Sequence, residues 1–256
     1  MILLKVVLPP LLILSASLAG RRWGDAVGGW LVGLPLTSGP VSAFLAVQYG
    51  AEFAASATDG SLVGTAAQGC FSLGYVLLAR QGWTIALLGG TMAYATAGFL
   101  FQLLPLSHWG VFVLALLTLS ASAHLLPHRT LVRSIMAAPW WDLPGRMLIA
   151  TVIVVTLTAA ATLVGAKTAG ILASFPVFGA VLAVFAHRMS GASAATQVLR
   201  GMVLALYGFA TFFFVLGLCL TSLGVITAFF AAIASTLLVQ LGALRFIQRG
   251  QMLKTA

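Results

Sequence analysis

The stretch VLRGMVLALYGFATFFFVLGLCL, residues Val198–Leu220, decides the class of fold. Its one charged residue is Arg200, close to its start, and from Gly201 to Leu220 no residue carries a charge. A run of about 20 apolar residues makes a helix long enough to cross the hydrocarbon core of a bilayer. This stretch therefore predicts a transmembrane helix.

Runs of the same kind recur along the whole chain. Of its 256 residues, 61% are hydrophobic and only 7% are charged, whereas about a quarter of the residues of a soluble protein are charged. The chain thus lacks the polar residues that a water-facing surface requires. We predict an all-α integral membrane protein, surrounded by the lipid bilayer, with about nine transmembrane helices. The predicted spans are Ile2–Ala19, Val27–Tyr49, Ser61–Ala79, Trp83–Leu104, Trp109–Leu126, Met147–Gly165, Ala169–Ala186, Val198–Leu220 and Gly224–Leu244.

Several function classes are disfavoured by composition and motifs. The net charge of +9 does not indicate nucleic acid, because the basic residues stand singly between apolar runs and form no patch. Cys70 and Cys219 lie inside apolar runs without a partner motif, so we expect neither a disulfide nor a zinc site. The sequence has no metal-ligand spacing, no phosphate-binding loop and no clear Ser-His-Asp arrangement. We therefore expect no enzymatic activity, no metal and no cofactor.

The distribution of basic residues predicts the orientation in the membrane. With nine spans, Lys5 and Lys167 fall on one side. The other side receives Arg21, Arg22, Arg80, Arg129, Arg133, Arg146, Arg188, Arg200, Arg245, Arg249 and Lys254. Because cytoplasmic loops are enriched in Lys and Arg, we expect an external N-terminus and a cytoplasmic C-terminus in the cytoplasmic (inner) membrane. Met1–Gly20 is then a retained first span rather than a signal peptide, as its Pro9-Pro10 pair and the lack of a clear cleavage site indicate.

Two stretches of the chain resemble each other. The segment SGPVSAFLAVQYGAEFAASATDGSLVG, residues 38–64, aligns with SFPVFGAVLAVFAHRMSGASAATQVLRG, residues 174–201, with one single-residue gap. The alignment pairs Ser38 with Ser174, Pro40 with Pro176, Ala55-Ser56-Ala57 with Ala192-Ser193-Ala194, and Gly64 with Gly201. Each copy reads as a Pro-interrupted helix and a small-residue loop, followed by two helices.

This repeat predicts an inverted architecture. Residues 1–104 form a first four-helix repeat, residues 105–146 a linker helix plus a cytoplasmic loop, and residues 147–256 a second four-helix repeat with a C-terminal tail. The single linker helix makes the second repeat cross the bilayer in the opposite direction. Inverted repeats of this kind recur among secondary transporters, where the two halves exchange conformations around a central site.

The second repeat also resembles a known family. The stretch VGAKTAGILASFPVFGAVLAVFAHRMSGASAATQVLRG, residues 164–201, is similar to the signature region of the GlpM-like small membrane proteins. The features that carry the resemblance are Pro176, Ala186-His187 and Leu199-Arg200. It covers Met147–Leu244 directly and the first half only through the repeat, and it departs from the pattern at Ala173, where a second proline is expected. The resemblance implies a four-span membrane fold and adds little about the substrate.

Two proline-broken helices are the candidate substrate site. The stretches are GLPLTSGPVS, Gly33–Ser42, and ASFPVFG, Ala173–Gly179. Each proline frees a backbone carbonyl, which lipid cannot satisfy, so protein, water or ligand must do so. The candidate residues are Pro35, Thr37, Ser38, Gly39, Pro40, Ser42, Ser174, Phe175 and Pro176. The alternative is a pair of simple kinks, with the hydroxyl groups bonding back to their own helices.

The remaining polar residues have two interpretations each. Glu52 and Asp59 flank an external loop, where they are solvated or line a vestibule. Gln68 is interpreted as an interhelical hydrogen-bonding residue rather than a substrate ligand. His187 is an interfacial residue or a pH-sensitive gate. No acidic residue falls clearly at the centre of a span, which disfavours a carrier built on a buried carboxylate.

These observations leave three functions open. The leading hypothesis is a small secondary transporter or permease for an unknown small-molecule or lipid-like substrate. A channel-like facilitator is a variant without energy coupling. The alternative is a non-transporting membrane scaffold or assembly partner, and the sequence leaves open whether the chain forms a homo-oligomer.

Overall fold

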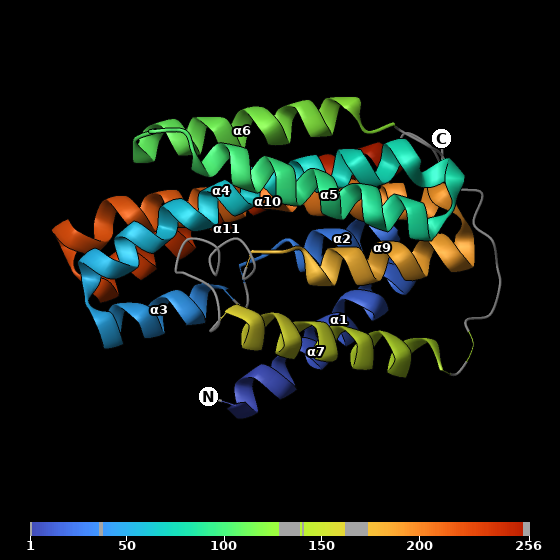
Figure 1. Cartoon of the computed structure of the whole chain (residues 1–256), viewed down its shortest axis with the longest axis horizontal. Coiled ribbons are helices and arrows are strands. Elements are labelled where there is room, and N and C mark those ends of the chain that lie inside the picture. The colour runs from blue at the N-terminus through green and yellow to red at the C-terminus, as the bar shows by residue number, and fades with distance from the viewer. Residues whose placement is uncertain (1, 36–37, 128–138, 140, 162–173, 253–256) are drawn as a thin grey trace.

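The chain folds into a bundle of helices. The computed structural model describes residues 2–35, 38–127, 139, 141–161 and 174–252. Within those ranges every regular element is a helix, and most of the helices run along the long axis of the molecule (Figure 1). The predicted all-α class is confirmed.

The helices follow one another closely along the chain. Their bounds are α1 Ile2–Trp23, α2 Asp25–Val32, α3 Ser38–Tyr49, α4 Ala51–Leu78, the 3₁₀ turn η1 Ala79–Gln81, α5 Trp83–Gln102, α6 His108–Leu125, α7 Asp142–Ala161, α9 Val177–Ser190, α10 Ala192–Leu223 and α11 Val225–Met252.

Several of these helices suit a membrane. Those long and apolar enough to cross one are Ala51–Gln81, Trp83–Gln102, His108–Leu125, Ala192–Leu223 and Val225–Ala243. Their outer faces carry large apolar side chains such as Leu77, Ile226 and Leu238, which are 78%, 75% and 72% exposed. Such faces suit lipid and would be a liability in water. The prediction of several apolar, membrane-length helices is confirmed, whereas the count of nine stays a prediction.

Two predicted boundaries differ from the structure. α4 begins at Ala51, so the segment around Ala55–Ala57, expected as a small-residue loop, is helical. α10 likewise begins at Ala192, before the predicted start at Val198. Alanine is the best helix former, and a single glycine before each helix turns the chain, so no longer loop is needed.

Glycines with positive φ join successive helices. Each of these glycines has φ between 77° and 108°. Their ψ values lie between 155° and 165° or at −179°, in a backbone region that is essentially restricted to glycine. The residues are Gly24, Gly50, Gly82, Gly191 and Gly224.

The central helices of the bundle are α4 and α10, which pack against each other. α4 also packs against α3, α5 and α6, and α10 against α2, α6, α9 and α11. Glycines let α2 and α10 touch through their backbones. A methyl group on Gly29 would overlap the carbonyl of Val198, and one on Gly201 would overlap that of Ala26. Small residues at such crossings are typical of helix packing in membranes.

Candidate functional site

The first break lies between α2 and α3. α2 ends at Val32 with Gly33 as its C-terminal cap, and α3 begins at Ser38. Pro35 lies in the break and its carbonyl accepts a hydrogen bond from the Gly39 N–H at 3.0 Å. Pro40 instead belongs to the first turn of α3, where a proline removes no intrahelical bond. Pro35 therefore lies between the two helices and Pro40 within α3, and Thr37 lies outside the described residues.

The second break immediately precedes α9. Pro176 is the residue before the helix, and Val177 and Ala180 donate to the carbonyls of Phe175 and Pro176, both at 2.8 Å. Pro176 thus ends an irregular segment, whereas Pro40 stands inside a helix. The two prolines that the sequence alignment pairs occupy different positions in their helices. Ala173, the residue at which the resemblance departs, lies outside the described residues.

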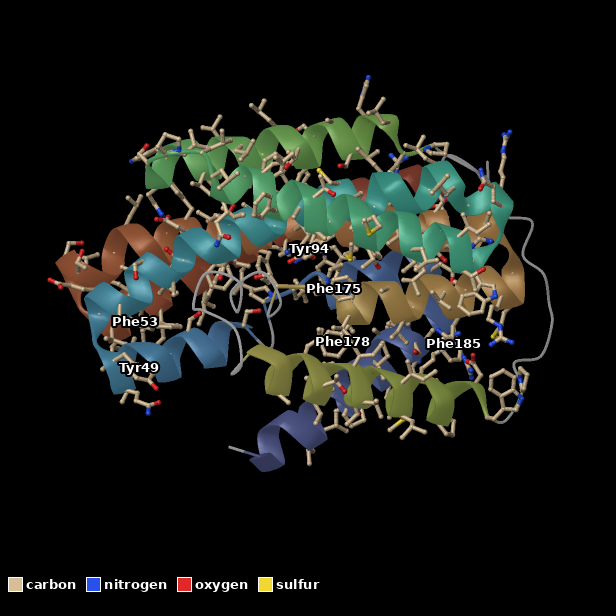
Figure 2. The ribbon with its side chains drawn as sticks, viewed as in Figure 1. Tyr49, Phe53, Tyr94, Phe175, Phe178 and Phe185 are labelled. Carbon is tan, nitrogen blue, oxygen red and sulfur yellow. The ribbon has the colours of Figure 1, made fainter. Side chains whose placement is uncertain are left out.

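Side chains of α4 and α5 cover the second break. The buried amide of Gln68 donates from Nε2 to the Ser174 carbonyl at 3.1 Å, as expected for an interhelical hydrogen bond. A methyl group on Gly64 would lie 2.6 Å from Ser174 Oγ, so Ser174 rests directly on α4. The Phe175 ring meets Tyr94 edge-on, with centroids 5.4 Å apart (Figure 2). It meets Phe71 in the same way at 5.9 Å.

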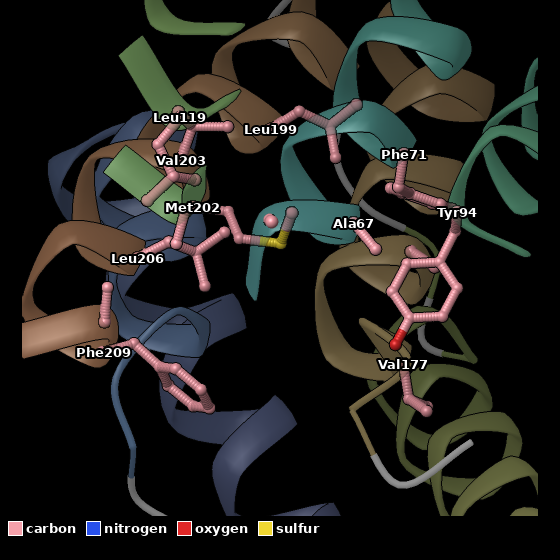
Figure 3. Close-up of a cluster of buried hydrophobic side chains, with 14 of the residues drawn as sticks. Ala67, Phe71, Tyr94, Leu119, Val177, Leu199, Met202, Val203, Leu206 and Phe209 are labelled. Atoms are coloured by element: carbon pink, nitrogen blue, oxygen red, sulfur yellow. The ribbon is translucent and has the colours of Figure 1, made fainter. Parts of the chain in front are cut away.

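α10 covers the first break. A methyl group on Gly33 would lie 2.6 Å from Ala205 Cβ and 2.8 Å from the Met202 carbonyl. One on Gly39 would lie 3.5 Å from the Phe212 ring. The two breaks therefore rest on two different central helices. Figure 3 shows a cluster of buried apolar side chains from these central helices and their neighbours, among them Met202 of α10 and Tyr94 of α5.

An unpaired donor and an unpaired acceptor are buried close to the first break. Gln240 of α11 donates to the Ala205 carbonyl at 2.7 Å, while its Oε1 is buried without a partner in the described part of the chain. Trp30, one turn before Gly33, likewise has a buried indole N–H for which these residues offer no acceptor. Buried polar groups are normally satisfied, so each unpaired one calls for an explanation.

One end of the bundle holds an ion-pair network around a buried carboxylate. Asp142, at the start of α7, is fully buried and accepts from Arg21 Nη2 at 2.7 Å and from Arg146 Nε at 3.1 Å. The Arg146 guanidinium also stacks over Phe185 at 5.0 Å. At the same end, Tyr75 of α4 bonds His187 Nδ1 at 3.2 Å. The contacts of Arg21, Phe185 and His187 join neighbouring helices, whereas the bond between Arg146 and Asp142 lies within α7.

The opposite end of the bundle holds a pair of polar side chains that no sequence motif indicates. Asp59 lies in α4 rather than in a loop, and its Oδ1 is 2.5 Å from Nδ1 of His108, the first residue of α6. These residues are 49 positions apart, and no motif in α6 predicts that His108 pairs with an acidic residue of α4. The only available signal was that His108 follows the end of a predicted span.

Comparisons with protein-family models, with curated proteins and with solved structures give no match for this chain. The resemblance to GlpM-like proteins therefore stays a prediction.

Proposed function

We propose that the protein is a small secondary transporter or permease whose solute binds at the two helix breaks, between two inverted halves. The observation that carries this proposal is a reciprocal pair of contacts. Gly33 of the first break meets Ala205 of α10, and Ser174 of the second break meets Gly64 of α4. Residue numbers 33 and 174 differ by 141, and so do 64 and 205. A two-fold axis requires contacts to occur in such pairs. If residue i contacts residue j, the residue equivalent to i in the other half must contact the residue equivalent to j.

The same offset relates other features of the two halves. It pairs Pro35 with Pro176 and Gly50 with Gly191, and an offset one residue larger pairs Gly82 with Gly224. Each half then reads as a break, a helix, a glycine, a long helix, a glycine and a further helix. The proposed repeat thus has a different register from the sequence alignment, which pairs Pro40 with Pro176.

The neighbours of the breaks favour an uncharged or lipid-like solute. Those described are glycine, alanine, methionine, glutamine and aromatic residues, and none of them is charged. A solute with one donor and one acceptor would also satisfy the indole of Trp30 and the Oε1 of Gln240. Exchange of the two halves between their conformations would expose this site to each side of the membrane in turn.

We propose that the protein lies in the inner membrane with its arginine-rich end facing the cytoplasm. Arg21 contacts the start of α7, Arg188 stacks on Trp83 at the start of α5, and Arg200 donates to the Leu126 carbonyl at the end of α6. These contacts support a common end for the basic residues, as the positive-inside rule requires. A reporter fused after Ala256 should therefore report the cytoplasm, and an external signal would contradict this orientation.

Reconstituted flux tests the proposal. Proteoliposomes would be assayed with a panel of neutral and amphipathic solutes and with fluorescent phospholipids. Gly39→Leu pushes a bulky side chain toward Phe212 at the first break, so we expect it to abolish any flux that the wild type supports. Gly242→Leu is the matched control, because Gly242 of α11 has open space around it. Flux retained by the Gly39 variant would place the site elsewhere.

A non-transporting scaffold is the second candidate. The observation that favours it is the contact of α2 with α10, where Gly29 and Gly201 leave no room between the backbones. A rigid crossing of this kind suits a structural role. If the wild-type proteoliposomes move no member of the panel, the scaffold becomes the better account.

A further inference from the structure

His108 has a hydrogen-bond acceptor at each of its ring nitrogens. Nδ1 faces the Asp59 carboxylate at 2.5 Å, and Nε2 faces the backbone carbonyl of Phe214 at 2.9 Å. A carbonyl never donates, and a carboxylate donates only when it is protonated. Both contacts are therefore attractive only if the pair carries one proton more than a neutral imidazole beside an ionised carboxylate.

The surroundings of the pair fit a held proton. The imidazole stacks on the Phe214 ring with centroids 5.2 Å apart and planes 8° apart, which suits a cationic ring. Gly217 brings α10 this close, since a methyl group there would overlap His108 and lie 2.5 Å from Thr58 Oγ1. The Asp59 side chain is 45% exposed and that of His108 19% exposed, so the carboxylate is the more open side of the pair.

Few other titratable groups face the pair. α6 packs against α4 and α10. On α4 the nearest acidic residue besides Asp59 is Glu52, two turns earlier and exposed. On α10 the nearest titratable side chain of the described residues is the Cys219 thiol. The described hydrogen bonds of the His108 ring go to Asp59 and to the Phe214 carbonyl, and neither Glu52 nor Cys219 takes part in them. The additional proton therefore resides on Asp59 and His108.

We propose that Asp59, His108 and the Phe214 carbonyl form a proton-binding site whose occupancy holds α6 against α4 and α10. In the occupied state Nδ1–H donates to Asp59 and Nε2–H donates to Phe214. On release, one ring proton passes to water, leaving a neutral imidazole and an ionised Asp59. A neutral imidazole has a single N–H, which stays on Nδ1 beside the carboxylate, the stronger acceptor. The bare Nε2 and the Phe214 carbonyl then repel each other as two acceptors, and α6 loses its bond to α10. This inference makes the pair the proton-coupling site of the proposed transporter, and that coupling role rests on the proposed function.

Nitrogen NMR tests the site without any transported solute. The full chain, labelled with ¹⁵N at its 4 histidines, would be studied in nanodiscs of phosphatidylethanolamine and phosphatidylglycerol. His108→Gln assigns the signal. At pH 7 we expect both ring nitrogens of His108 to be protonated, and in Asp59→Asn we expect His108 to lose its second ring proton at a lower pH than in the wild type. Glu52→Gln is the matched control and should leave the titration unchanged.

The outcomes separate the site from the function. A His108 with one ring proton at pH 7, or an Asp59→Asn midpoint equal to that of the wild type, overturns the proton site. Flux in proteoliposomes with and without a pH gradient then tests coupling. Two ring protons without any flux would leave the proton site standing and remove the transport function. Flux that is indifferent to the pH gradient in the wild type would leave transport standing and remove the coupling role.

Discussion

At the scale of single residues, polar side chains connect segments that are far apart in the sequence. Gln68 was expected to bond between helices, and it does, but its acceptor Ser174 lies 106 positions away. The pair of Asp59 and His108 was not expected, because spacing along one helix says nothing about the helix that packs on it. The polarity of Asp59 predicts a loop, but the alanines around it favour a helix, and the structure has a helix there.

The Gln68 amide should stabilise the second break. In Gln68→Leu the half-buried Ser174 carbonyl loses its donor, and an unsatisfied polar group costs up to about 1–3 kcal/mol when it is buried. We expect a lower midpoint of thermal unfolding in detergent. Gln48→Leu, at an exposed position of α3, is the matched control. Equal midpoints for the two variants would mean that water replaces the amide at Ser174.

Gly217 should be intolerant of any side chain. In Gly217→Ala the new methyl group meets His108 and Thr58, and overpacking of this kind costs about 1–3 kcal/mol. We expect lower thermal stability together with loss of the doubly protonated His108 signal. Gly242→Ala, in open space, should change neither. A Gly217→Ala protein that keeps the His108 signal would show that α6 sits less tightly on α10 than the contacts indicate.

At the scale of elements, apolar runs predicted where helices lie better than where they begin. α5 and α6 match their predicted spans closely, because Gly82 and the Pro105 region bound them. The span Val27–Tyr49 is instead two helices, α2 and α3, separated at Pro35. Sequence alone could not choose between Pro35 and Pro40, since a proline breaks a helix in its interior but fits its first turn.

Replacing a glycine between two helices should lower stability because the backbone conformation at these joints is strained for any other residue. Gly224 has φ 77° and ψ 165° with open space around it. Gly224→Ala therefore adds no clash, and we expect a loss of about 1–3 kcal/mol from the strained backbone. Gly242→Ala, inside α11, should be neutral or stabilising, because alanine favours a helix. Thermal unfolding measures both, and a neutral Gly224→Ala would mean that the joint relaxes to another conformation.

At the scale of the whole molecule, the proposed two-fold relation predicts paired behaviour. After replacement of Cys70 and Cys219, cysteines would be placed at Gly33 and Ala205 in one protein and at Gly64 and Ser174 in another. If the halves exchange conformations, each cross-link should block flux to the same degree, and each should form less readily when solute is present. A cross-link that blocks at one pair and leaves flux intact at the other would contradict the exchange.

The single-glycine joints also bear on how the chain enters the bilayer during synthesis. One residue advances the backbone by about 4 Å, so α10 and α11 have no connecting segment that could wait in water while one helix crosses. A helix end stranded in hydrocarbon would leave its terminal N–H and carbonyl groups without partners. We therefore expect the two helices to leave the translocation machinery together as a hairpin that folds at Gly224.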